Sequence, residues 1–223
     1  MLDALIIAPE ITKGMKSLGS KALLNIKNSV SILDYQIQEL KKLHKNINIF
    51  IATGFESDKI KKVATKYSNI EIIENKNYEI SNQAKCLSIF SSLYSSERLL
   101  IISNGILFKN QTFDCFDNNH SKIFVIDKQK NNFTIGCNSG EQLNYLFYDL
   151  PTPWTECLLL NKQSIETVRD ISENHNIDHL YLFEIINLMI EKHHIRFDSI
   201  KIPKKNIMKI NTIKDIPKAK LFI

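Results

Sequence analysis

Histidines and cysteines are the side chains in this sequence best suited to bind a transition metal, but their spacing does not favour a site. His175 and His179 lie four residues apart, and His193 and His194 are adjacent. Neither pair has a third ligand at a spacing typical of zinc sites. The cysteines are scattered and form no CxxC pair: Cys86, Cys115, Cys137 and Cys157. We expect reduced thiols and no zinc.

Lysine is the second chemically capable residue type, and it could bind anions. The formal net charge is +5. A loose basic cluster closes the chain: Lys201, Lys204, Lys205, Lys209, Lys214, Lys218 and Lys220. A basic cluster is compatible with nucleic-acid binding, but here no aromatic residues are interleaved to stack on bases. We therefore expect that nucleic acid is not the partner.

The composition is typical of a globular domain, with 43% hydrophobic residues in 223. The sequence has no apolar run long enough to predict a membrane span. Asp3 stands where a signal peptide would carry basic charge. We expect a cytoplasmic protein with a single domain over residues 1–223.

The first half alternates short apolar runs with helical periodicity. Strands are predicted at 3–8, 47–53, 70–74 and 99–103. The runs 3–8 and 99–103 are almost wholly apolar, which is typical of strands covered on both faces of a sheet. The helices between them are predicted to start near Ser31, Ser57 and Asn82. This alternation predicts βαβ units and an α/β fold around a mainly parallel sheet.

The second half changes character. Short strand-like pieces separated by Asn, Gly and Pro turns predict an antiparallel extension of the sheet: 122–127, 133–137, 143–148 and 156–160. Helices follow at about 164–172 and 178–192. Strands near 195–202 and 207–210 precede a short terminal turn.

Three segments, in order, resemble the NTP-transferase family, most closely its choline-phosphate and sugar-1-phosphate cytidylyltransferases. The stretch 21–26 (KALLNI) is similar to the family's PKALLPI, and 69–75 (NIEIIEN) to its NIEIVEN. The second segment continues to residues 103–108 (SNGILF), which are similar to a strand ending in GDVLF, and the third, 207–216 with Ala219, is similar to the closing EIDTPEDLEKA. The resemblance implies a three-layer α/β sandwich with a mixed, mainly parallel sheet, Rossmann-like and of the GT-A type. It also implies a nucleotide-binding half (1–110) and an acceptor-side half (111–223).

The same resemblance implies roles for individual residues. Lys21 occupies the position of the family's catalytic lysine. The implied nucleotide contacts are Ala8, Lys13, Lys16 and Asn82, and the implied acceptor contacts are Trp154, Glu156 and Glu184. Each has an ordinary alternative: Asn82 as a helix cap, Trp154 as a packing residue, Glu184 on a solvated helix face, and Lys21 as an exposed lysine.

The chain departs from the family where phosphates and metal are held. Where the family has AAGxGxR, residues 8–14 read APEITKG, so Pro9 removes an N–H and Glu10 adds negative charge. Gly105 and Asn211 occupy the positions of the two metal aspartates, and neutral residues at both disfavour a Mg²⁺ site. Asp114 and Asp117 could compensate, but a solvated turn is the simpler interpretation.

Three functions remain open. The first is a nucleotidyltransferase-like protein, weakly active or inactive, that binds a nucleoside triphosphate (CTP favoured) and a small phosphorylated acceptor, with Mg²⁺ only if active. The second is a non-catalytic module that binds a ligand or a protein partner. The third is a GT-A-like glycosyltransferase, which the absence of any Asp-x-Asp motif disfavours.

Overall fold

The computed structural model describes residues 2–11, 16–113, 120–127, 133–138 and 140–223. In this part of the chain, no helix has the length and apolar character needed to cross a membrane. Predicted site residues Lys13, Asp114 and Asp117 lie outside the described residues.

The centre of the molecule is a mixed sheet of nine strands. Four neighbouring strands run parallel, in the order β6 (Arg98–Ser103), β1 (Leu2–Ala8), β4 (Asn48–Thr53) and β5 (Ile70–Glu74). The strand β11 (Thr152–Asn161) pairs antiparallel with β6 and with β8 (Ser121–Val125), and β12 (Phe197–Lys201) pairs parallel with β8. The antiparallel strands β9 (Ile135–Cys137) and β10 (Phe147–Tyr148) extend the sheet from the start of β11.

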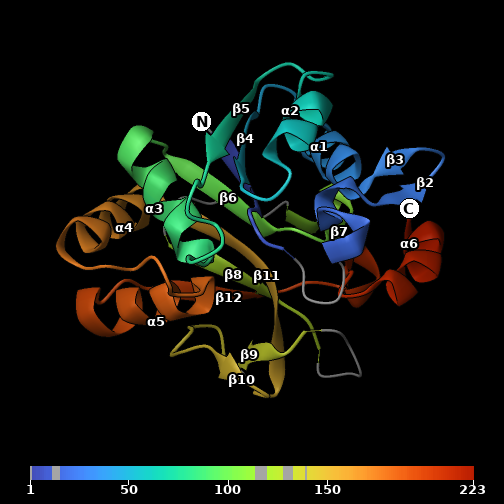
Figure 1. Cartoon of the computed structure of the whole chain (residues 1–223). Helices are drawn as coiled ribbons and strands as arrows, with labels where there is room; N and C mark the ends of the chain where they lie inside the picture. The colour runs from blue at the N-terminus through green and yellow to red at the C-terminus, as the bar shows by residue number, and fades with distance from the viewer. Residues whose placement is uncertain (1, 12–15, 114–119, 128–132, 139) are drawn as a thin grey trace.

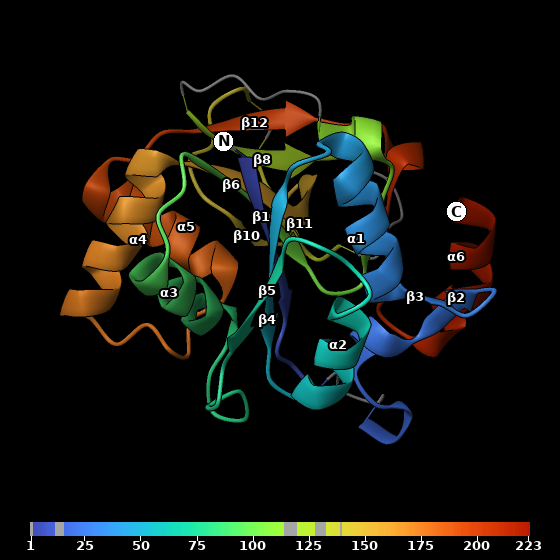
Figure 2. The same ribbon diagram turned by 90° about the horizontal axis from the view of Figure 1, so that it is seen from above.

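Helices cover both faces of this sheet, which makes three layers (Figure 2). On one side lie α3 (Gln83–Leu93), α4 (Lys162–Asn174) and α5 (Leu182–His193). On the other side lie α1 (Ile32–Leu43) and α2 (Ser57–Ala64). The predicted fold class, a three-layer α/β sandwich with a mainly parallel sheet, is confirmed.

The almost wholly apolar strands contribute to two hydrophobic cores, one on each face of the sheet, because successive side chains point to opposite faces. On β1, Leu5 and Ile7 pack toward α3–α5, whereas Ala4 and Ile6 pack toward α1 and α2. All four are buried. Both faces of β1 are therefore covered along its length.

Smaller elements support the α1 side. The strand β13 (Ile207–Lys209) pairs with β7 (Ile106–Phe108), and β2 (Asn25–Lys27) pairs with β3 (Val30–Ser31). Near the C-terminus, α6 (Ile216–Phe222) lies beside β2 and β3 (Figure 1). A short turn was predicted there, but the chain forms a helix because Ala219 packs into the third core cluster with Ile26 and Leu107.

Helix starts were predicted with mixed success. Ser31 caps α1 as predicted. Its hydroxyl accepts from the Asp34 N–H at 3.0 Å, and the Asp34 carboxylate accepts from the Ser31 N–H at 3.2 Å. At α2 the N-cap is Glu56, in the left-handed conformation, and not Ser57. The helix α5 begins at Leu182, four residues later than predicted.

Candidate functional site

A cavity of about 370 Å³ opens at the carboxyl ends of β1 and β6. Ligands of open α/β sheets commonly bind outside this edge. Charged and amide side chains line part of it: Glu10, Lys21, Asn104, Glu156, Lys209 and Asn211. Aromatic rings line another part: Tyr148, Trp154, Tyr181 and Phe183. The cavity can therefore receive a ligand with an ionic group and a flat or apolar group.

Lys21 begins a one-turn 3₁₀ helix, η2 (Lys21–Leu23), and its side chain lines the cavity. The residue is only 9% exposed. Burial lowers the pKa of its ammonium group, and the nearby Glu10 carboxylate partly opposes that shift. Lys21 is thus a largely desolvated lysine that lines the cavity.

Glu56 holds the turn that leads into Lys21. The Ser20 N–H donates to Glu56 Oε2 at 2.7 Å, and Lys59 forms an ion pair with the same carboxylate. These two hydrogen bonds lower the pKa of Glu56. Sequence reasoning missed Glu56 because its partner Ser20 is far away in the chain. We infer that Glu56 positions Lys21.

Glu10 follows β1 and enters the cavity next to Lys21. Burial raises its pKa, while the Lys21 charge and a hydrogen bond from Gln83 act in the opposite direction. Both Glu10 and Gln83 line the cavity. A carboxylate here repels phosphate, so Glu10 makes the charge of this segment unlike that of a phosphate-binding loop.

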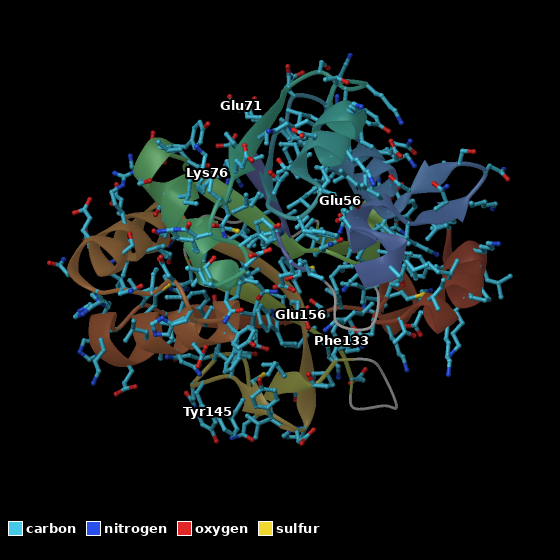
Figure 3. All side chains as sticks on the ribbon, in the orientation of Figure 1. Glu56, Glu71, Lys76, Phe133, Tyr145 and Glu156 are labelled. Atoms are coloured by element: carbon cyan, nitrogen blue, oxygen red, sulfur yellow. The ribbon has the colours of Figure 1, made fainter. Side chains whose placement is uncertain are left out.

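Glu156 reaches the cavity through a distortion of β11. The pairing of β11 with β8 shifts register between Trp154 and Leu158, and Glu156 has a φ of 59°. A left-handed residue inside a strand is strained by about 1–3 kcal/mol, and such residues cluster at functional sites. Its carboxylate forms a short ion pair with Lys209. Glu156 and Phe133, both labelled in Figure 3, each contact Lys209.

Ser103 and Asn104 end β6 at the floor of the cavity. The Ser103 hydroxyl and the Asn104 Oδ1 are buried without a hydrogen-bond partner among the described residues. Both residues line the cavity. Buried polar atoms are normally hydrogen-bonded, so each of these two oxygens indicates a position for a ligand group or a water.

The two positions matched to the metal aspartates lie differently relative to the cavity. Gly105 was matched to the first metal aspartate, but Asn104 lines the cavity and Gly105 is not among its lining residues. Gly105 has a φ of 86° and lies against Lys21 instead. Asn211, matched to the second aspartate, does line the cavity.

These residues do not fit a two-carboxylate Mg²⁺ site. Asn104 and Asn211 offer amides, and the described residues contain no cluster of three His, Cys, Asp or Glu that could hold a metal. The carboxylate of Glu156 is paired with Lys209, and that of Glu10 interacts with Lys21. Mg²⁺ prefers carboxylate oxygens in octahedral geometry. We therefore derive no step through a metal.

Of the other residues that the resemblance implies as ligand contacts, some line the cavity and others do not. Ala8 and Trp154 line the cavity, although the Trp154 indole already donates to the Cys157 carbonyl at 2.9 Å and only 2% of the residue is exposed. Glu184 does not line it. Its carboxylate accepts from the Tyr181 N–H at 2.8 Å at the start of α5, and a role for Glu184 as an acceptor contact stays a prediction. Lys16 begins the 3₁₀ turn η1 (Lys16–Leu18).

Asn82 lies in a second depression of about 380 Å³ beside the cavity. It precedes α3 without a side-chain cap bond, and its amide donates to the His179 carbonyl at 2.6 Å. The two hollows share Glu10 and Tyr181 among their lining residues. The two hollows are therefore neighbours on either side of these residues.

No family model matches the sequence, and no curated protein sequence matches it. Solved structures do match. The CTP:phosphocholine cytidylyltransferase of Streptococcus pneumoniae is similar with a TM-score of 0.78 and 15% identity, covering 99% of this chain and 98% of that one. The inositol-1-phosphate CTP transferase of T. maritima gives 0.79 and 14%, covering 99% and 94%.

A putative glucose-1-phosphate thymidylyltransferase of Bacillus anthracis gives a TM-score of 0.74 at 12% identity, covering 99% of this chain and 94% of that one. Each likeness covers nearly the whole of both chains. At these identities the matches establish the fold, and they agree with the resemblance inferred from the three sequence segments. The chain has the fold of the nucleotidyltransferases.

Proposed function

We propose that the chain binds a nucleoside triphosphate, with CTP as the first candidate, and a small phosphorylated acceptor in this cavity. Nucleotidyl transfer by this chain is weak or absent. The observation that carries the proposal is the buried Lys21 in a cavity at the carboxyl edge of the sheet. Two similar structures are described as acting with CTP, which supports CTP as the first nucleotide to test.

Weak transfer follows from the donors around the cavity. In such a reaction an acceptor phosphate oxygen would bond to the α-phosphorus, and pyrophosphate would leave with its electron pair. That charge must be neutralised as it develops. Here Glu10 and Glu156 add negative charge, and Asn104 and Asn211 offer neutral amides in place of carboxylates. These groups neutralise the charge of a departing pyrophosphate poorly, so transfer is weak.

Thermal unfolding with CTP, UTP, ATP, GTP and dTTP tests the binding. At 100 times its Kd, a ligand stabilises the native state by about 2.7 kcal/mol, which raises the Tm by several degrees. We expect the largest shift with CTP, its loss in Lys21→Met, and its retention in Lys205→Met at an exposed lysine outside the cavity. No shift with any nucleotide would overturn the proposal. Pyrophosphate release then measures any transfer.

The aromatic residues around β10 and α5 favour a non-catalytic binding module as the second candidate. Tyr145, Phe147, Tyr148 and Tyr181 are 44–55% exposed. Tyr145 lies at the outer edge of the molecule, and Glu156 lies near its centre (Figure 3). A protein partner on this surface would cover these rings and slow hydrogen exchange of the neighbouring backbone amides. Slower amide exchange at residues 145–148 in a cell extract than in buffer would reveal such a partner. No observation favours a glycosyltransferase.

A further inference from the structure

Lys209 brings a second positive charge into the cavity. It ends β13, whose pairing with β7 sets Lys209 opposite Ile106. The Ile210 N–H donates to the Gly105 carbonyl at 2.8 Å and fixes this register. Lys209 is therefore held beside the end of β6, close to Asn104.

The surroundings of Lys209 desolvate its ammonium group. Its side chain is only 14% exposed, and its Nζ lies 5.8 Å from the centre of the Phe133 ring. The charge of Lys209 is one of the causes that lower the pKa of Lys21, after burial. Two ammonium groups thus face one cavity, together with Asn104 and Asn211.

We propose that Lys209 acts with Lys21 as the fixed positive charge for a ligand phosphate, so that binding requires no divalent cation. The proposal rests on the proposed function and adds to it how the phosphate is recognised. An ammonium is a compact charge that binds phosphate directly. It stands among amides that cannot replace the carboxylates of a magnesium site.

Glu156 is the competitor in this arrangement. Its carboxylate forms an ion pair with Lys209, and Glu156 lines the cavity at the irregularity in β11. A ligand phosphate therefore displaces Glu156 from Lys209 when it binds. Removing the charge from Glu156 strengthens phosphate binding, whereas removing the charge from Lys209 weakens it.

Calorimetric titration of the full chain with CTP and with inorganic pyrophosphate tests this recognition. We expect equal Kd values in EDTA and in MgCl₂ at matched ionic strength. Lys209→Gln should weaken binding about 10- to 100-fold, since a hydrogen bond to a charged group is lost. Glu156→Gln should tighten binding several-fold.

Lys205→Gln is the matched control, because it removes the same charge from an exposed lysine outside the cavity. Binding that requires Mg²⁺, or that is equal in Lys209→Gln and Lys205→Gln, overturns this inference and leaves the proposed function standing. No binding of CTP under either condition overturns both. The comparison of EDTA with MgCl₂ uses the unaltered chain, so it decides the question even where Lys209→Gln does not fold.

Discussion

The side chain of Lys21 lies against Gly105, so closely that a β-carbon at residue 105 would be 2.7 Å from Lys21 Cδ. The same β-carbon would be 2.8 Å from the Ile210 carbonyl oxygen. The absence of a side chain at 105 is therefore part of how Lys21 reaches the cavity. A carboxylate at residue 105 and this position of Lys21 exclude each other.

Gly105→Asp should accordingly damage the site and not repair it. The φ of 86° strains any side chain, and the two close contacts add to the strain. We expect a loss of about 1–3 kcal/mol in unfolding free energy and weaker CTP binding. Chemical denaturation measures the loss. Gly140→Asp is the control, because its nearest contact would be 3.7 Å away. Equal stability of the two variants would contradict the prediction.

Replacing Asn104 and Asn211 with aspartates should make the stability of the protein depend on Mg²⁺. We expect Asn104→Asp with Asn211→Asp, combined with Lys209→Gln, to be stabilised by MgCl₂. The reason is that two carboxylates then face the cavity without the adjacent cation. At ten times the Kd the gain is about 1.4 kcal/mol, detectable as a rise in Tm. NaCl of equal ionic strength is the control. The same response in the unaltered chain would refute this account of the site.

Glu10→Gln should stabilise the protein at neutral pH. The folded pKa of Glu10 is raised above 4.5, so the folded state binds more protons than the unfolded state between 4.5 and the folded value. Ionised Glu10 therefore lowers stability as pH rises through that window. The gain from Glu10→Gln should be absent below pH 4.5 and largest above the folded pKa. Each kcal/mol regained raises the Tm by about 2–4 °C.

Thermal scans of both proteins from pH 4 to pH 8 measure this difference. The titration of Lys21 has the opposite effect on stability, over a pH range that ends at 10.5. Its pKa is lowered below 10.5, so the folded state is disfavoured while Lys21 is charged and gains stability as pH rises toward 10.5. A gain from Glu10→Gln that stays constant over the whole range would contradict the burial of the carboxylate.

Glu56→Gln should loosen the turn before Lys21. The variant loses the charge that accepts from the Ser20 N–H at 2.7 Å and pairs with Lys59. We expect about 1–2 kcal/mol lower stability and a weaker affinity for pyrophosphate, because Lys21 is less well positioned. The control is Glu191→Gln, whose side chain is 70% exposed. Affinity equal to that of the unaltered chain would show that Glu56 does not position Lys21.

Tyr181→Ala should separate recognition of the base from recognition of phosphate. Tyr181 lines both hollows and stacks with Phe183 at 6.1 Å between ring centres. Loss of one aromatic contact is worth about 0.5–1.5 kcal/mol. We expect weaker CTP binding and unchanged pyrophosphate binding by calorimetry. Tyr145→Ala, at an exposed ring outside both hollows, is the matched control. An equal loss for both ligands would mean that Tyr181 shapes the fold.

The sequence by itself determined the layers of this protein. Bare apolar runs such as 99–103 predict strands covered on both faces, and helical spacing with the Ser31 cap predicts α1. These signals are local, because strand and helix periodicity is visible within a few residues. The departures from the family in the first loop were also visible, because they are changes of residue type.

Only the tertiary structure decided which side chains share the cavity. The end of β6 brings Asn104 to the cavity, whereas Gly105 is not among its lining residues. The pairing of β13 with β7 brings Lys209 to Glu156. The left-handed Glu156 follows from a bulge that no local pattern shows. Contacts between distant segments depend on strand order and register, which periodicity does not encode.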